Sequence, residues 1–172
     1  MQNFADDLPA ACGAARRAGE PWAVELDTWS LPARAAAVGR ARELLRAALA
    51  ALGFDAETTG DGVLMVSELA TNALRHARPP YEMRLRRDDR ALTCEIADAS
   101  PVLPALPRRA GPAHQALDGI AGTALPDLRE AGRGLEIVKH LSGGRCGTWP
   151  TVLRATGAAV CGKSVWFSLD LP

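Results

Sequence analysis

The chain has 172 residues, enough for one domain with a core of its own, and its composition excludes several classes of protein. Its 20 Lys and Arg residues balance 20 Asp and Glu residues, so the formal net charge is zero, unlike the basic footprint of a nucleic-acid-binding protein. No apolar run approaches the length of a membrane span, and residues 1–19 lack the apolar segment of a secretory signal. We therefore expect a cytoplasmic protein that contacts neither nucleic acid nor membrane directly.

The first part of the chain predicts a tail, a strand and a helix. Residues 1–20 are rich in Ala and Gly without clear periodicity, which indicates a loosely ordered tail. Residues 22–29 alternate polar and apolar side chains, as a strand does. Ser30 and Pro32 then signal the start of a helix, and Gly53 signals its end. The apolar positions of this amphipathic helix are Val38, Ala41, Leu45, Ala48 and Leu52.

A second helix is predicted to begin after Asp55 and to end before Pro79, because proline cannot continue the helical hydrogen-bond ladder. Glu68, Asn72 and His76 recur along it at intervals of four residues, so they form a polar row on one face. A solvated surface is the ordinary explanation for such a row. This row lies beside the apolar seam rather than opposite it, however, and it can therefore line a cleft.

Two strand candidates follow, and they predict a hairpin. Residues 81–86 and 92–96 alternate apolar and polar side chains, and a short turn-like link at 88–90 joins them. One face of this hairpin is apolar and the other is charged. Helices are therefore expected to cover only one face of the sheet.

The rest of the chain predicts a long loop, a third helix and the closing strands. Residues 99–131 are rich in Pro and Gly, which at this length is typical of a lid, a binding loop or a disordered segment. Residues 132–141, GRGLEIVKHL, predict a helix that ends at Gly143 and Gly144. Two or three strands complete the chain, the clearest at 163–171.

The four cysteines are widely spaced and include no C-x-x-C pair, so a zinc site is not expected. We expect reduced thiols that act as small apolar side chains. The cysteines are Cys12, Cys94, Cys146 and Cys161.

Four stretches, in this order, resemble the boxes of one known superfamily. SELATNALRHA at 67–77 is similar to the N-box of the GHKL ATPases, and Asp98 matches the aspartate that begins their next box. GRGLEIV at 132–138 resembles their second glycine box, and GKSVWFSLDLP at 162–172 resembles the closing strands of the small bacterial members. The resemblance implies a single histidine-kinase-like ATPase domain over 21–172 with the Bergerat ATP-binding fold. That fold is a two-layer α/β sandwich of a mixed, largely antiparallel sheet with helices on one face.

The resemblance also implies Mg-ATP as the ligand and assigns roles to three polar residues. Asn72 would hold Mg²⁺, and an amide oxygen is a hard ligand suited to that ion. Glu68, one turn away on the same helix, would be the base that orients an attacking hydroxyl. Asp98 would accept a hydrogen bond from the exocyclic amine of adenine. His76 is expected to pack or to form a hydrogen bond at the helix end rather than to act as a ligand.

The glycine box would bind the phosphates of the nucleotide. Gly132, Arg133, Gly134 and Leu135 lie at a helix start, where free backbone N–H groups and the helix dipole favour an anion. Ser164 matches a hydroxyl position that approaches adenine in relatives.

Two departures from the family pattern bear on this assignment. The usual D-x-G-x-G reads DASPV at 98–102, so both glycines are missing, and a low affinity for ATP would follow. Kinase relatives often carry an arginine just before the glycine box, where this chain has Glu130. Arg129 and Arg133 are the available substitutes. The pattern therefore favours nucleotide binding more strongly than catalysis.

The small bacterial members that this chain most resembles are anti-sigma factors that are also serine protein kinases. The resemblance implies that the protein binds a sigma factor and phosphorylates a Ser or Thr of an anti-anti-sigma protein of the STAS type. One alternative is a non-catalytic regulatory module with the same fold. Another is the ATPase half of a split histidine kinase, although no phospho-acceptor helix is evident. The sequence leaves open whether the protein forms a homodimer.

Overall fold

The computed structural model describes residues 24–104, 133–154, 157 and 159–172. The predicted N-terminal tail and residues 105–131 of the predicted lid lie outside these residues, and residues 99–104 form neither helix nor strand. The elements in chain order are β1 (Val24–Leu31), α1 (Ala36–Ala51), α2 (Ala56–His76), β2 (Tyr81–Arg87), β3 (Ala91–Asp98), α3 (Arg133–Leu141), β4 (Cys146–Leu153) and β5 (Val160–Asp170).

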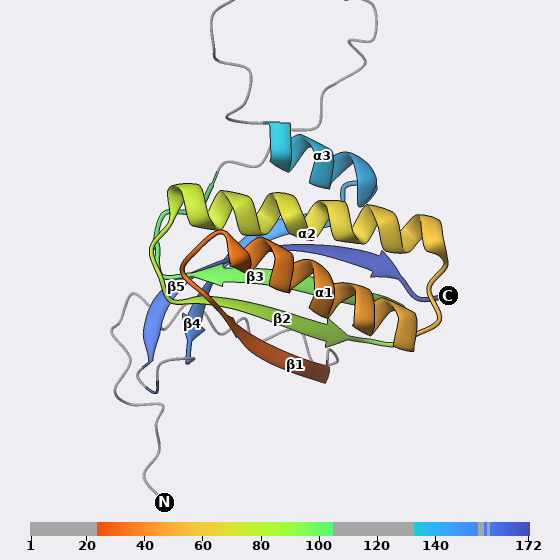
Figure 1. The fold of residues 1–172 in the computed structure, drawn as a ribbon, viewed down its shortest axis with the longest axis horizontal. Helices are drawn as coiled ribbons and strands as arrows, with labels where there is room; N and C mark the ends of the chain where they lie inside the picture. The colour runs from red at the N-terminus through yellow and green to blue at the C-terminus, as the bar shows by residue number, and fades with distance from the viewer. Residues whose placement is uncertain (1–23, 105–132, 155–156, 158) are drawn as a thin grey trace, which may run out of the picture.

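The described strands form one sheet in the order β1-β2-β3-β5-β4, and the three helices cover one of its faces (Figure 1). This arrangement confirms the predicted two-layer α/β sandwich. All four neighbouring pairs are antiparallel, so the described sheet contains none of the parallel pairing that a mixed sheet would have. The predicted hairpin is β2-β3, and Asp88 accepts hydrogen bonds from the backbone of Arg90 and Ala91 in its turn.

Helices α2 and α3 begin and end close to the predicted residues, whereas the predicted start of α1 at Ser30 is wrong: Ser30 belongs to β1 and α1 begins at Ala36. Asp55 is the N-cap of α2, and its carboxylate accepts a hydrogen bond from Thr58 N at 2.7 Å. This bond holds the pKa of Asp55 below its ordinary value. Gly143 and Gly144 follow α3 with φ of 61° and 83°, a conformation that glycine adopts without steric cost, and they end the helix.

The core lies between the helices and the sheet. Alternate residues of each strand point toward the helices, and the largest fully buried apolar side chains come from both layers. They include Leu45, Leu49, Met65, Leu69, Met83, Leu85, Ile96 and Phe167. Gly62 of α2 lets the layers approach closely, since a Cβ there would lie 3.1 Å from Leu49 and 3.2 Å from Leu169.

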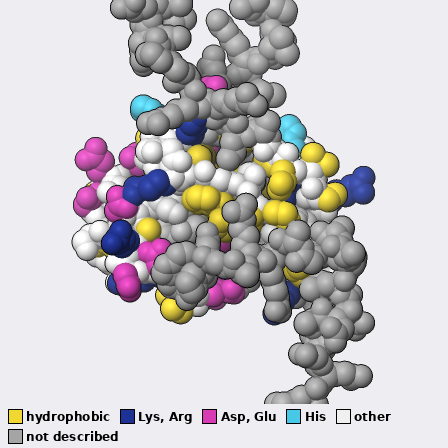
Figure 2. Space-filling model, turned by 180° about the vertical axis from the view of Figure 1, so that it is seen from behind, with side chains coloured by type: hydrophobic (Ala, Val, Ile, Leu, Met, Phe, Trp, Pro, Cys, Tyr) yellow, Lys and Arg dark blue, Asp and Glu magenta, His cyan; other side chains and the backbone are white. Residues whose placement is uncertain are grey.

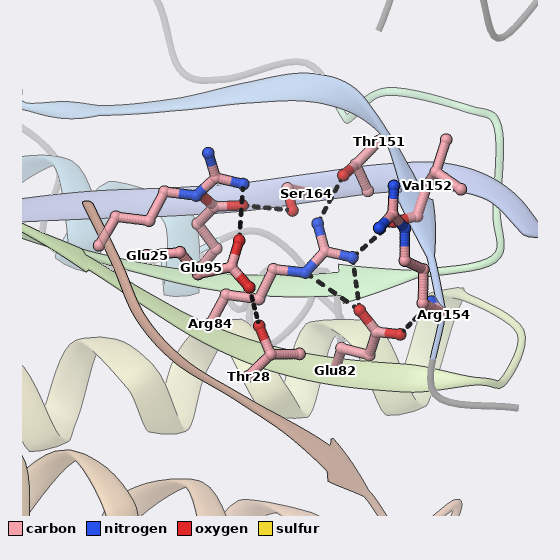
Figure 3. A network of polar contacts seen from close by, with 10 residues as sticks. Glu25, Thr28, Glu82, Arg84, Glu95, Thr151, Val152, Arg154 and Ser164 are labelled. Atoms are coloured by element: carbon pink, nitrogen blue, oxygen red, sulfur yellow. Dashed lines mark hydrogen bonds and ion pairs between the residues drawn. The ribbon is translucent and has the colours of Figure 1, made fainter. Parts of the chain in front are cut away.

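The opposite face of the sheet carries charged side chains, as predicted, but several of them are buried. Seen from this side, the molecule shows a hydrophobic patch near its middle with Lys, Arg, Asp and Glu side chains beside it (Figure 2). Arg84 of β2 is 6% exposed and donates to Glu82 at 3.0 Å and to Thr151 of β4 at 2.7 Å (Figure 3). Glu95 is fully buried and lies 2.8 Å from Arg86. Burial raises the pKa of Glu95, and the Arg86 guanidinium partly opposes that rise.

Three further observations concern the cysteines, metals and membranes. Cys94 and Cys146 are free, whereas Cys161 is disulfide-bonded, so the expectation of reduced thiols is wrong at Cys161. The residues that the structure describes contain no cluster of three or more His, Cys, Asp or Glu side chains that could hold a metal ion. Among the same residues, no helix has both the length and the apolar character needed to cross a membrane.

Candidate functional site

A pocket of about 240 Å³ opens between α2, α3, β3 and β5. It brings together segments that lie far apart in the sequence, because α3 packs beside α2, and α2 lies over the neighbouring strands β3 and β5 (Figure 1). Its walls are mainly apolar and its polar groups are few, as in most ligand sites. The lining residues are Leu69, Asn72, Ala73, His76, Ile96, Asp98, Pro104, Gly134, Leu135, Lys163 and Val165.

Helix α2 supplies one wall of the pocket. Asn72 and His76, one turn apart, line it together with the apolar Leu69 and Ala73. Glu68, the first member of the predicted polar row, lies one turn before Asn72 and is half-buried. The row therefore borders a pocket, as its position beside the apolar seam predicts.

The start of α3 closes against this polar row at Gly134. A Cβ at residue 134 would lie 2.6 Å from Oε2 of Glu68 and 3.3 Å from Nδ2 of Asn72. Any larger residue would therefore collide with the Glu68 carboxylate. The structure thus brings three predicted site residues together: Glu68, Asn72 and Gly134.

The other residues of the glycine box are placed less completely. Leu135 lines the pocket beside Gly134. Arg133 begins α3, but its side chain is not described, and Gly132 lies outside the described residues, as do Arg129 and Glu130. The backbone N–H groups of the first turn of α3 have no partners within the helix, which suits them to bind an anion.

The floor of the pocket holds an ion pair between two strands. Oδ1 of Asp98 accepts hydrogen bonds from Nζ of Lys163 at 2.8 Å and from the backbone N of Ser100 at 2.9 Å. Asp98 is 1% exposed and Lys163 is 7% exposed. Burial raises the pKa of Asp98, and Lys163 opposes that rise. Ile96 and Val165 give the floor its apolar part.

The sequence pattern does not single out Lys163, and the family resemblance pointed to its neighbour Ser164 instead. Asp98 pairs with Lys163 across β3 and β5, so Lys163 points toward the helices and Ser164 toward the opposite face. There the Ser164 hydroxyl donates to Glu95 at 2.9 Å, and Ser164 does not line the pocket. The alternation of Lys163 with Val165 and the apolar residues after it is the signal that could have placed Lys163 on the pocket side.

The segment after Asp98, which lacks the expected glycines, forms a turn at the mouth of the pocket. The backbone of Ser100 donates to the Asp98 carboxylate, and Pro104 lines the pocket. Val102 between them is 72% exposed. This segment therefore borders the site, although the residues that follow it lie outside the described part of the chain.

Comparison with known families agrees with this geometry. The profile of the histidine kinase-like ATPase domain matches residues 31–143, which is more than half of the chain. The chain therefore belongs to the histidine kinase-like ATPase domain family, within the GHKL superfamily. A search of curated proteins found no match. Membership supports ATP binding and a regulatory role of the GHKL type.

The described residues fit a nucleotide with its magnesium ion. The pocket is smaller than the ~300 Å³ or more of typical ligand sites, so it suits a base better than an entire nucleotide. Asn72, which lines it, carries an amide oxygen of the kind that Mg²⁺ accepts. Gly134 lets the start of α3 lie close to Glu68 and Asn72, because a Cβ there would come within 3.3 Å of both side chains.

Proposed function

We propose that this protein binds Mg-ATP with the base in the pocket between α2 and β5 and with the phosphates at the start of α3. The observation that carries the proposal is the meeting of Asn72, Asp98 and Gly134 at one pocket. These residues come from three segments, and each has a property that the ligand requires. Asn72 would hold the ion, which would offset the phosphate charge, and Asp98 would accept a hydrogen bond from the base.

We further propose that the protein is a cytoplasmic serine/threonine-protein kinase and an anti-sigma factor. Glu68 would accept the proton of a Ser or Thr hydroxyl on a STAS-type antagonist. The hydroxyl oxygen would form a bond to the γ-phosphorus while the bond to the bridging oxygen of the β-phosphate breaks, which leaves ADP. The role is supported by the position of the Glu68 carboxylate beside Gly134, next to the start of α3 where the phosphates are proposed to bind.

Phosphorylation would change which partner the protein binds, because it adds negative charge to the antagonist. A phosphoserine adds roughly two negative charges, which can break an interface packed against the kinase. The antagonist would then dissociate, and the protein would be free to hold its sigma factor inactive.

A second candidate is a regulatory module that binds nucleotide or partner without transferring phosphate. The observation that favours it is the ion pair of Asp98 with Lys163, together with the turn that replaces the two expected glycines. Asp98 must then keep Lys163 as a partner while it binds the base, and the backbone after Asp98 lacks the small residues that allow a close approach.

The two candidates differ in one measurement. The full chain is incubated with γ-labelled ATP, Mg²⁺ and the STAS-type protein encoded nearest to it, and label on that protein is followed with time. The kinase proposal predicts stoichiometric label on a Ser or Thr. An unlabelled STAS partner that nevertheless binds the protein would favour the non-catalytic module.

A further inference from the structure

The ion pair of Asp98 and Lys163 on the pocket floor has hydrogen-bond donors and acceptors that the contact between the two side chains does not use. An ammonium group has three donors, and Lys163 makes one described hydrogen bond, to Oδ1 of Asp98. Oδ1 also accepts from Ser100 N, so both described bonds to this carboxylate fall on the same oxygen. Oδ2 of Asp98 accepts no hydrogen bond from the described residues. An unused acceptor and an unused donor therefore lie side by side.

The Asp98 carboxylate and the Lys163 ammonium are charged groups in a mainly apolar pocket. Both residues line the pocket, where Asn72 and His76 are the other polar side chains and the rest of the lining is mainly apolar: Leu69, Ala73, Ile96, Leu135 and Val165. A buried ion pair is weak evidence for stability, because the cost of desolvating two charges offsets much of their attraction. Its position at the base of a ligand pocket suggests recognition instead.

We propose that Lys163 and Asp98 together read one edge of an adenine ring. Oδ2 of Asp98 accepts a hydrogen bond from the exocyclic amine, and Nζ of Lys163 donates to a ring nitrogen next to that amine. This inference rests on the proposed nucleotide site and names Lys163 as a determinant of its base specificity.

The order of donor and acceptor on the base decides the specificity. Adenine presents an amine donor with a ring-nitrogen acceptor on either side of it, N1 and N7. Hypoxanthine and guanine carry a carbonyl in place of the amine and an N–H at N1, whereas N7 remains an acceptor. With the sugar and phosphates held toward Asn72 and α3, the carbonyl would face the carboxylate of Asp98, and a contact through N1 would also set an N–H against the ammonium of Lys163. The carbonyl contact is repulsive in either case, so ATP should bind more tightly than ITP.

The test compares nucleotides on the unmodified protein first. Calorimetric titrations use ATP, ITP, 1-deaza-ATP and 7-deaza-ATP, where each deaza analogue replaces one ring nitrogen next to the amine by C–H. Loss of a hydrogen bond to a charged donor should weaken one of the two deaza analogues by roughly ten- to a hundred-fold relative to ATP. ITP should weaken by a comparable factor.

Two variants assign the effect to the side chain. Lys163→Met removes the donors and should bind ATP and the affected deaza analogue equally, whereas Lys163→Arg keeps a donor and should retain part of the difference. Circular dichroism checks that each variant is folded. Persistence of the full difference in Lys163→Met would assign the contact to another residue and overturn the inference.

The titrations of the unmodified protein alone distinguish a failure of this inference from a failure of the proposed function. Tight binding of ATP, ITP and both deaza analogues alike would overturn the role of Lys163 and leave the nucleotide site standing. Absence of any ATP binding would overturn the nucleotide site and this inference with it.

Discussion

At the scale of single residues, the three side chains of the polar row on α2 lie in three different environments. Glu68 lies against Gly134, Asn72 lines the pocket, and His76 lines it one turn further along, at the helix end. The interval of four residues predicted that these side chains share a face, because helix geometry alone fixes this. Lys163 was not predictable in the same way, since its meeting with Asp98 depends on the register of two strands.

Glu68→Gln tests the proposed base. The change removes the proton acceptor but keeps the size of the side chain, so ATP binding should stay nearly intact. Phosphotransfer should fall by roughly two to four decades, the usual contribution of such a group. Initial rates with the STAS partner measure this, and Glu57→Gln, at an exposed position in the first turn of the same helix, is the matched control. Full phosphotransfer by Glu68→Gln would refute the base assignment.

Asp55→Ala tests the N-cap of α2, the helix that carries the N-box. The Asp55 carboxylate accepts from Thr58 N, which lowers its pKa, so its ionised form stabilises the fold above the unfolded pKa of about 3.9. That contribution is lost as the pH falls through the lower folded pKa. In thermal melts, Asp55→Ala should have a lower melting temperature than the wild type at neutral pH. The difference between the two melting temperatures should be smaller at acidic pH. Asp55→Asn keeps a capping oxygen and should lie between them. An equal difference in melting temperature at both pH values would contradict the claim that the ionised Asp55 carboxylate stabilises the helix.

At the scale of elements, the contact between α2 and α3 makes the site. The sequence predicted both helices, because capping residues, glycines and apolar spacing are local signals. The close approach at Gly134 is not local, since it depends on Glu68 and Asn72 of another helix. The glycine-box resemblance pointed to Gly134, but only the structure shows what a side chain there would displace.

Gly134→Ala tests that approach. The new Cβ would lie 2.6 Å from Oε2 of Glu68, the far end of a flexible side chain, so Glu68 should move and the fold should persist. We expect weaker ATP binding and reduced phosphotransfer with little change in the melting temperature.

Gly60→Ala is the matched control on α2, because a Cβ there would meet nothing within 4 Å. It should leave activity unchanged and add about 0.5–1 kcal/mol of stability, the usual gain from alanine inside a helix. Equal activity of Gly134→Ala and Gly60→Ala would show that the contact between the two helices does not matter for the site.

At the scale of the whole molecule, the sheet carries a pocket on one face and a buried ionic network on the other (Figure 3). The alternation in β2 and β3 predicted which face is charged. It could not predict that Glu82, Arg84 and Glu95 are buried, because Arg84 also donates hydrogen bonds to residues of β4, which β3 and β5 separate from β2 in the sheet. The strand order likewise depends on contacts across the chain and not on any local pattern.

Arg84→Met tests this network. It removes the Arg84 guanidinium from the buried Glu82 carboxylate, which keeps its hydrogen bond from the backbone N of Arg154, and should destabilise the fold by up to about 3–5 kcal/mol. The double variant Glu82→Gln with Arg84→Met removes both charges and should lose less stability than Arg84→Met alone.

Urea denaturation measures the difference, with Arg87→Met as an exposed control on the same strand. A double variant less stable than Arg84→Met would mean that the buried charges do not act as a pair.

The central claim is that the pocket binds Mg-ATP through Asn72, and calorimetric titration of the full chain with ATP, with and without Mg²⁺, tests it most directly. We predict saturable binding that Mg²⁺ strengthens in the wild type, and loss of most of that Mg²⁺ effect in Asn72→Ala. At a hundredfold excess of ligand over Kd, the same binding should stabilise the fold by about 2.7 kcal/mol. No binding heat and an unchanged melting temperature at millimolar Mg-ATP would contradict the account.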